Sequence, residues 1–146
     1  MLNETIQHSY GSENDHLDIL LHELIRAVDS WPSECQTVFE EFRGALEEQI
    51  RSEERFLFPF YEQRSQLKSH SPTDRMRSEH RQLQVLLDQI QQKLEMSDWQ
   101  IDLEVTVLKK LLAQHCSTEE LVVYSKMDEV LTAQERDAII SRYERD

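Results

Sequence analysis

The chain has few of the residues that form turns and crosslinks. Only two glycines, three prolines and two cysteines occur among its 146 residues. So few turn-forming residues disfavour a turn-rich β-sandwich or a low-complexity chain, and two cysteines are too few for a disulfide-stabilised secreted domain. Glu, Gln, Leu and Arg are frequent instead, and these residues favour helices. The sequence therefore predicts an all-α protein.

Basic side chains are also scarce, because 16 Lys and Arg residues stand against 29 Asp and Glu residues, for a formal net charge of −13. This charge repels phosphate backbones and anionic lipid, so we expect no nucleic-acid or membrane partner. Residues 1–12 lack the apolar segment of a signal peptide. No apolar run approaches the roughly 20 residues of a membrane helix. We therefore expect a cytoplasmic protein with reduced cysteines.

Capping motifs divide the chain into five predicted helices. Four long helices are expected at about 12–30, 33–63, 73–95 and 97–126, and a short one at 133–144. Three capping boxes mark helix starts: Ser33 with Gln36, Ser97 with Gln100, and Thr132 with Glu135. Pro59 is expected to kink or end the second helix. This pattern predicts one domain, 1–146, with its core at 12–127: an up-down-up-down four-helix bundle with a short fifth C-terminal helix.

Each long helix carries polar residues within its apolar face, at positions where leucine would be expected. Helical spacing places these residues in the predicted core: His16 on the first helix, Gln49 and Glu53 on the second, His80 on the third, and His115 and Glu119 on the fourth. A buried carboxylate is costly unless it is paired or bound to a cation. Imidazole and carboxylate groups together suit iron, manganese or zinc. The pattern therefore predicts a shared metal site.

The two halves of the chain are similar to each other. Asp15-His16 corresponds to Glu79-His80, and Gln49-Ile-Arg-Ser-Glu53 corresponds to His115-Cys-Ser-Thr-Glu119. Two similar helical hairpins that meet about a pseudo-two-fold axis would bring their polar residues to one level of the bundle. This is the geometry of a dinuclear site in a bundle core.

These motifs resemble the hemerythrin-like (HHE cation-binding) domain family over about residues 15–127. The matching segments are Asp15-His16, Gln49-x-x-x-Glu53 with the following Leu57-Phe58-Pro59, Glu79-His80, and His115-x-x-x-Glu119. The resemblance implies a four-helix bundle that holds a non-haem di-iron centre. It also implies the ligand set: His16, His80 and His115 as terminal ligands, and Glu53 and Glu119 as bridging carboxylates. Glu120 is the alternative to Glu119.

The chain departs from the family pattern at two positions. Gln49 stands where the family has the histidine of its second-helix motif, and Gln84 stands where oxygen carriers have a second histidine on the third helix. An amide oxygen is a weaker, neutral ligand. Gln49 is therefore either a weak metal ligand or a hydrogen-bonding partner of the ligands. The departure leaves two irons or a single iron as alternatives.

The resemblance implies a non-haem iron protein that binds oxygen, nitric oxide or iron itself for sensing, storage or stress response. The absence of a nucleophile elbow, a phosphate loop or a dinucleotide fingerprint favours this binding role over an enzyme. One alternative is a di-iron enzyme that acts on peroxide or nitric oxide or in iron–sulfur repair. Another is a metal-free degenerate domain that acts as a protein-interaction module, with Gln49 as the mark of the lost metal.

Overall fold

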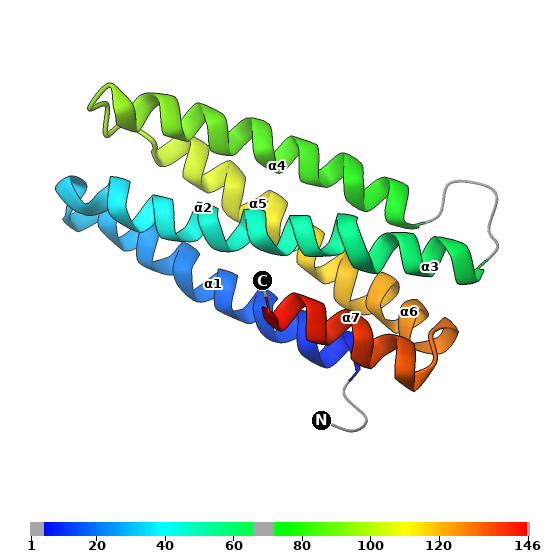
Figure 1. Ribbon diagram of the computed structural model, residues 1–146. Helices are drawn as coiled ribbons and strands as arrows, with labels where there is room; N and C mark the ends of the chain where they lie inside the picture. The colour runs from blue at the N-terminus through cyan, green and yellow to red at the C-terminus, as the bar shows by residue number, and fades with distance from the viewer. Residues whose placement is uncertain (1–4, 66–71, 146) are drawn as a thin grey trace.

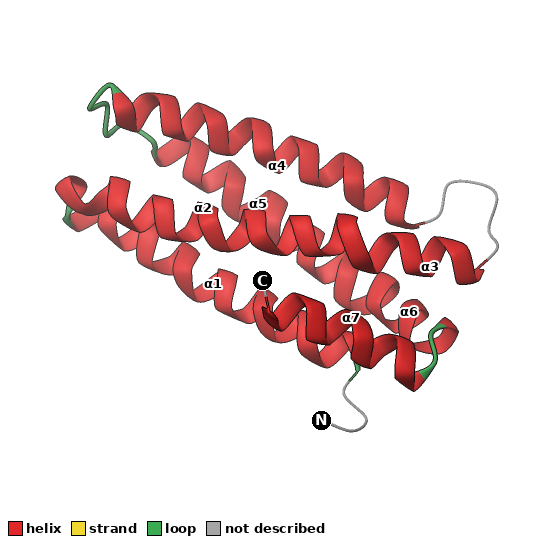
Figure 2. Cartoon of the chain, in the orientation of Figure 1, coloured by secondary structure: helices red, strands yellow, loops and turns green. Residues whose placement is uncertain are grey.

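The computed structural model describes residues 5–65 and 72–145, and all regular structure in these ranges is helical (Figure 2). Four long rods lie side by side, and a shorter helix follows them (Figure 1). The rods are α1 (Ile6–Ser30), α2 (Cys35–Ser52) continued by α3 (Phe58–Ser65), α4 (Pro72–Glu95), and α5 (Asp102–Thr118) continued by α6 (Tyr124–Val130); the fifth helix is α7 (Ala133–Arg145). The predicted all-α bundle is confirmed. None of the described helices is both long and apolar enough to cross a membrane.

The rods form a closed ring of neighbours around the bundle axis. Rod α1 packs against α2 and α5, and α4 packs against the same two helices from the other side. Helix α7 runs along the outside and contacts α1. It buries Ile139 and Ile140 against one end of the core. The short fifth helix is therefore an outer layer on the bundle.

Capping at the helix starts only partly follows the predicted motifs. The box of Thr132 and Glu135 is confirmed, since each residue's backbone N–H donates to the side chain of the other, at 2.9 and 3.1 Å. Ser33 instead lies in a 3₁₀ turn, and the start of α2 has no side-chain cap. Ser97 has a φ of 57° in the turn before α5, and the helix begins only at Asp102. Local turns therefore override two of the three sequence patterns.

Two rods contain a π-helical turn, and the two turns occupy corresponding positions. One covers Glu53–Leu57 between α2 and α3, and the other covers Glu119–Val123 between α5 and α6. In each turn the glutamate carbonyl accepts the N–H of the residue five positions later, which is Phe58 or Tyr124. The turn repeats at the similar segment of each half, and π-helical turns often mark functional sites.

Of the two effects predicted for Pro59, a kink or an end of the helix, the second does not occur, since α3 continues to Ser65. The proline lies two residues after the end of the π-helical turn at Leu57. In the other half Ser125 stands at the corresponding position, and a π-helical turn forms there as well. Proline is therefore not the common cause of the two turns.

The apolar core consists of two clusters, one at each end of the bundle. One cluster joins α1, α2, α4 and α5 and contains Phe39, Phe42 and Leu87. The other surrounds α3, α6 and α7 and contains Phe58 and Met127. Along each rod, buried polar residues lie between the residues of the two clusters. Together they form one polar layer: Asn14, Gln49, Ser52, Glu53, His80, His115 and Glu119. The fold thus places polar groups at the middle of a dry bundle.

Candidate metal centre

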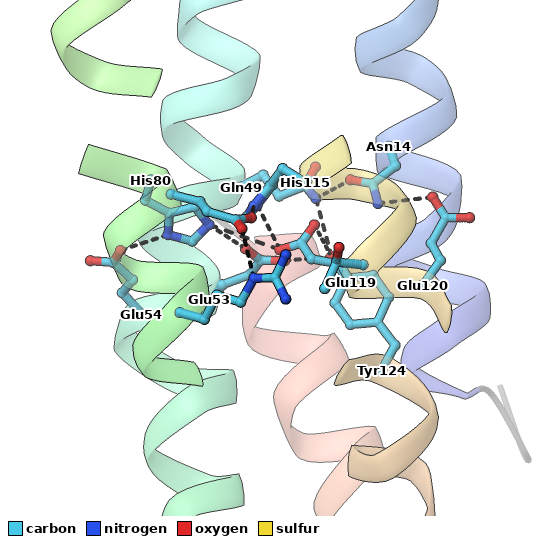
Figure 3. Close-up of polar contacts among 12 residues, drawn as sticks. Asn14, Gln49, Glu53, Glu54, His80, His115, Glu119, Glu120 and Tyr124 are labelled. Atoms are coloured by element: carbon cyan, nitrogen blue, oxygen red, sulfur yellow. Dashed lines mark hydrogen bonds and ion pairs between the residues drawn. The ribbon is translucent and has the colours of Figure 1, made fainter. Parts of the chain in front are cut away.

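Four ionisable side chains from three of the rods meet in the polar layer, and we call them the Glu–His cluster: Glu53, His80, His115 and Glu119. All four residues are at most 4% exposed. One potential ligand atom from each side chain lies within 4.8 Å of the others. Figure 3 shows the two carboxylates and the two imidazoles pointing toward one another between the rods. Four of the five residues predicted as ligands are thus brought together.

The imidazole nitrogens and carboxylate oxygens converge closely. The Nε2 atom of His80 lies 3.0 Å from Oε1 of Glu53 and 3.9 Å from Oε2 of Glu119. The Nε2 atom of His115 lies 3.1 Å from the same Glu119 oxygen. Each of the four side chains therefore directs one nitrogen or oxygen atom to a common point.

Two atoms at this point lack a hydrogen bond of acceptable geometry within the described part of the chain: Nε2 of His80 and Oε2 of Glu119. Buried polar atoms without partners are costly and rare in folded proteins. A cation would coordinate both atoms and would compensate the charge of two buried carboxylates. The residues present therefore fit a divalent metal ion.

Two further carboxylates hold the histidine rings from outside. The Nδ1 atom of His80 lies 2.6 Å from Glu54, and Nδ1 of His115 lies 2.7 Å from Glu79. Glu54 is adjacent to Glu53 in the chain, and Glu79 is adjacent to His80. A carboxylate on Nδ1 fixes the ring orientation and increases the basicity of Nε2. Both rings are thereby set with Nε2 toward the common point.

The outer carboxylates give a first testable expectation. Replacing Glu79 by glutamine is expected to weaken metal binding by roughly 10-fold, because loss of such partners commonly costs roughly 10- to 100-fold. Affinity is measured by competition with a chromophoric chelator. Asp88 provides a matched control: it pairs with Arg43 at 2.5 Å on the outside of the bundle, so Asp88→Asn is expected to leave affinity unchanged. Equal affinities for wild type and Glu79→Gln would contradict the orienting role.

The electrostatics of the cluster are strongly perturbed, as is common at functional sites. Burial and the nearby charge of Glu119 raise the pKa of Glu53 to about 7. Burial alone would also raise the pKa of Glu119, but His115 and His80 outweigh it and lower that pKa. Burial alone would lower the pKa of His80, whereas its carboxylate partners raise it to about 11. In the absence of metal, protons and ion pairs compensate the buried charges.

The structure corrects the prediction for His16. This residue lies on the exposed side of α1 and is not part of the Glu–His cluster. The buried face of α1 instead runs through Tyr10, Asn14 and Leu17. His16 is two residues beyond Asn14, which turns its side chain about 200° around the helix. Ile19, three residues after His16, is 58% exposed as well, so both lie on the outer face of α1.

Gln49, the residue that departs from the family motif, is buried beside the cluster. Its Nε2 atom donates to Oδ1 of Asn14 at 2.6 Å and contacts the hydroxyl of Tyr124 at 3.4 Å. Asn14 in turn donates to Glu120 at 3.0 Å. Glu119 is therefore the acid in the cluster, and Glu120, the alternative, lies at its edge.

Sequence reasoning interpreted Tyr124 as a core residue near the site, but its hydroxyl lies within hydrogen-bonding distance of Oε2 of Glu53 and, at 3.0 Å, of Oε1 of Glu119. In a regular α-helix, residues five apart point about 140° away from each other. The π-helical turn between Glu119 and Val123 brings Tyr124 onto the same face as Glu119. Helical periodicity therefore could not have found Tyr124. The sequence signal for it was the similarity of the two segments that contain the π-helical turns.

Comparison with known proteins gives one match. The family model described as the hemerythrin HHE cation-binding domain matches residues 5–127. Searches of the curated proteins and of the solved structures return no match. The matched segment contains the whole Glu–His cluster and both π-helical turns.

Proposed function

Because the chain belongs to the hemerythrin HHE cation-binding domain family, we propose that it is a non-haem iron protein whose ion is held by the Glu–His cluster. The observation that carries this proposal is the convergence of four buried ligand atoms from Glu53, His80, His115 and Glu119. Two of these atoms, Nε2 of His80 and Oε2 of Glu119, have ion-pair contacts but no hydrogen bond in the described part of the chain. Two imidazoles with two carboxylates are a donor set that suits iron.

The residues around the cluster would prepare it for a small ligand. Bound iron supplies a Lewis-acidic, redox-active centre that binds diatomic molecules. The two apolar clusters of the core exclude bulk water from both sides, and Glu54 and Glu79 hold the rings in place. A surface cleft of about 420 Å³ between α1 and α5 reaches Asn14, which is hydrogen-bonded to Gln49. We therefore propose that the ligand is oxygen or nitric oxide, or that iron itself is the cargo.

The proposed role is sensing, storage or stress response rather than turnover. The test is to express the protein in iron-rich medium and to measure iron content and the visible spectrum. We expect bound iron and a spectrum that differs between the reduced protein, the protein under air and the protein with nitric oxide. Bound iron with no spectral response to either gas would favour iron storage.

Two other outcomes of the same experiment would select the alternatives. Steady turnover of peroxide or nitric oxide by the iron-loaded protein, lost in His115→Ala, would identify an enzyme. A protein that takes up no metal on reconstitution would contradict the proposal. That result would favour a protein-interaction module.

A further inference from the structure

A set of neutral polar groups lies directly beside the Glu–His cluster, and we call it the amide–phenol group: Asn14, Gln49 and Tyr124. All three are at most 4% exposed. The Gln49 amide links the other two, through contacts of 2.6 Å to Asn14 and 3.4 Å to the Tyr124 hydroxyl. The group contains no imidazole and no carboxylate. The fully buried polar layer therefore has one half with imidazoles and carboxylates and one half with only amides and a phenol, with Glu120 at its edge beside Asn14 (Figure 3).

Each of the two carboxylates directs one oxygen to each half of the polar layer. Oε1 of Glu53 and Oε2 of Glu119 face the histidine nitrogens. Oε2 of Glu53 and Oε1 of Glu119 both lie within hydrogen-bonding distance of the Tyr124 hydroxyl and share its single proton. A carboxylate that bridges two cations with one oxygen on each ion needs both of its oxygens free. Here one phenol holds the second oxygen of each carboxylate.

We propose that the centre takes one divalent metal ion per chain, and that the Tyr124 hydroxyl lies where a second ion would have to bind. The inference rests on the proposed function, because it presupposes that the Glu–His cluster binds metal. It specifies which half of the polar layer does so.

Charge and ligand chemistry support a single ion. The two carboxylates of the cluster carry two negative charges when ionised, which match one divalent cation. A second ion in the other half would find only amide and phenol oxygens, which are weak neutral ligands. The Gln49 amide nitrogen donates to Asn14, and its oxygen, which is buried without a hydrogen bond in the described part of the chain, is a single neutral donor. Glu120, the next acid, is only partly buried and accepts from Asn14.

The test measures the number of ions bound per chain and whether two ions are magnetically coupled. The metal-free protein is dialysed against Co²⁺ without oxygen, and bound cobalt is measured by elemental analysis. A parallel sample with Mn²⁺ is examined by electron paramagnetic resonance. We expect one Co²⁺ per chain and the signal of isolated Mn²⁺ ions. Two ions per chain, or an exchange-coupled manganese pair, would overturn the proposal.

A matched pair of double variants tests the role of Tyr124. Tyr124→Phe with Gln49→His removes the hydroxyl and supplies an imidazole, so we expect a second Co²⁺ per chain. Tyr10→Phe with Gln49→His removes a hydroxyl from the neighbouring buried tyrosine, which contacts Ser52 at 2.7 Å, and we expect one ion. Circular dichroism checks that both variants are folded.

The outcomes distinguish failure of the role given to Tyr124 from failure of the proposed function. A folded Tyr124→Phe, Gln49→His variant that still takes one ion would overturn the role of Tyr124. A second ion in the Tyr10 control would overturn it as well. Wild-type protein that takes no ion at all would contradict the proposed function and, with it, this inference.

Discussion

Replacing His80 by alanine is expected to cause the largest loss of metal affinity among single substitutions in the Glu–His cluster. His80 is fully buried, and its Nε2 atom is 3.0 Å from Glu53 and 3.9 Å from Glu119. Its removal deletes a donor and leaves the repulsion between the two buried carboxylates less compensated. We expect affinity to fall by more than the roughly 100-fold upper range for loss of an outer partner. Chelator competition with Fe²⁺ measures it.

The control for this substitution is His16→Ala. Both changes remove an imidazole, but His16 is exposed on α1 and outside the cluster. We expect His16→Ala to bind metal as the wild type does. A loss of affinity at His16 that equals the loss at His80 would contradict the position of the site.

Metal loading is expected to stabilise the fold strongly. The ligand atoms come from three rods and converge only in the folded bundle, so the ion binds the native state in preference to the unfolded chain. At a free metal concentration a thousandfold above Kd, the free energy of unfolding should rise by about 4 kcal/mol. Urea denaturation with Fe²⁺ under anaerobic conditions and with a chelator measures the difference. Coincident unfolding curves would contradict metal binding to the native state.

Neutralising Glu53 is expected to stabilise the metal-free protein. The folded-state pKa of Glu53 is raised from 4.5 to about 7, so its ionisation opposes folding. This cost is absent below about pH 4.5, develops as pH rises and is complete above pH 7. Glu53→Gln is therefore expected to stabilise the metal-free protein at pH 8 by about 1–3 kcal/mol, with a gain that vanishes near pH 4.5. The variant should also lose the stabilisation by metal, which would show that the charge is retained for binding.

Much of the site was predictable because its residues interrupt apolar faces at helical spacing. Glu53 follows Gln49 by four residues, and Glu119 follows His115 by four, so each pair shares a face of its helix. A carboxylate among leucines and phenylalanines has few physical explanations other than a partner or a cation. The sequence therefore predicted the bundle and four members of one cluster.

The parts that the sequence did not predict depend on tertiary packing. The face of α1 that turns inward is set by how Tyr10, Asn14 and Leu17 pack. Residue type favours the histidine at position 16 over the amide at position 14 as a metal ligand. Tyr124 joins the centre only because a π-helical turn places it on the same face of the helix as Glu119. Periodicity rules assume regular helices, so they fail at the very turns that shape this site.

The central claim is that the Glu–His cluster holds the metal ion. Its most direct test is an anomalous-difference map from a crystal of the iron-loaded protein, with data collected above and below the iron absorption edge. The account predicts one peak within coordination distance of His80, His115 and both glutamates of the cluster. A peak on the outside of α1 beside His16, or no peak in a crystal that contains iron-loaded protein, would contradict it.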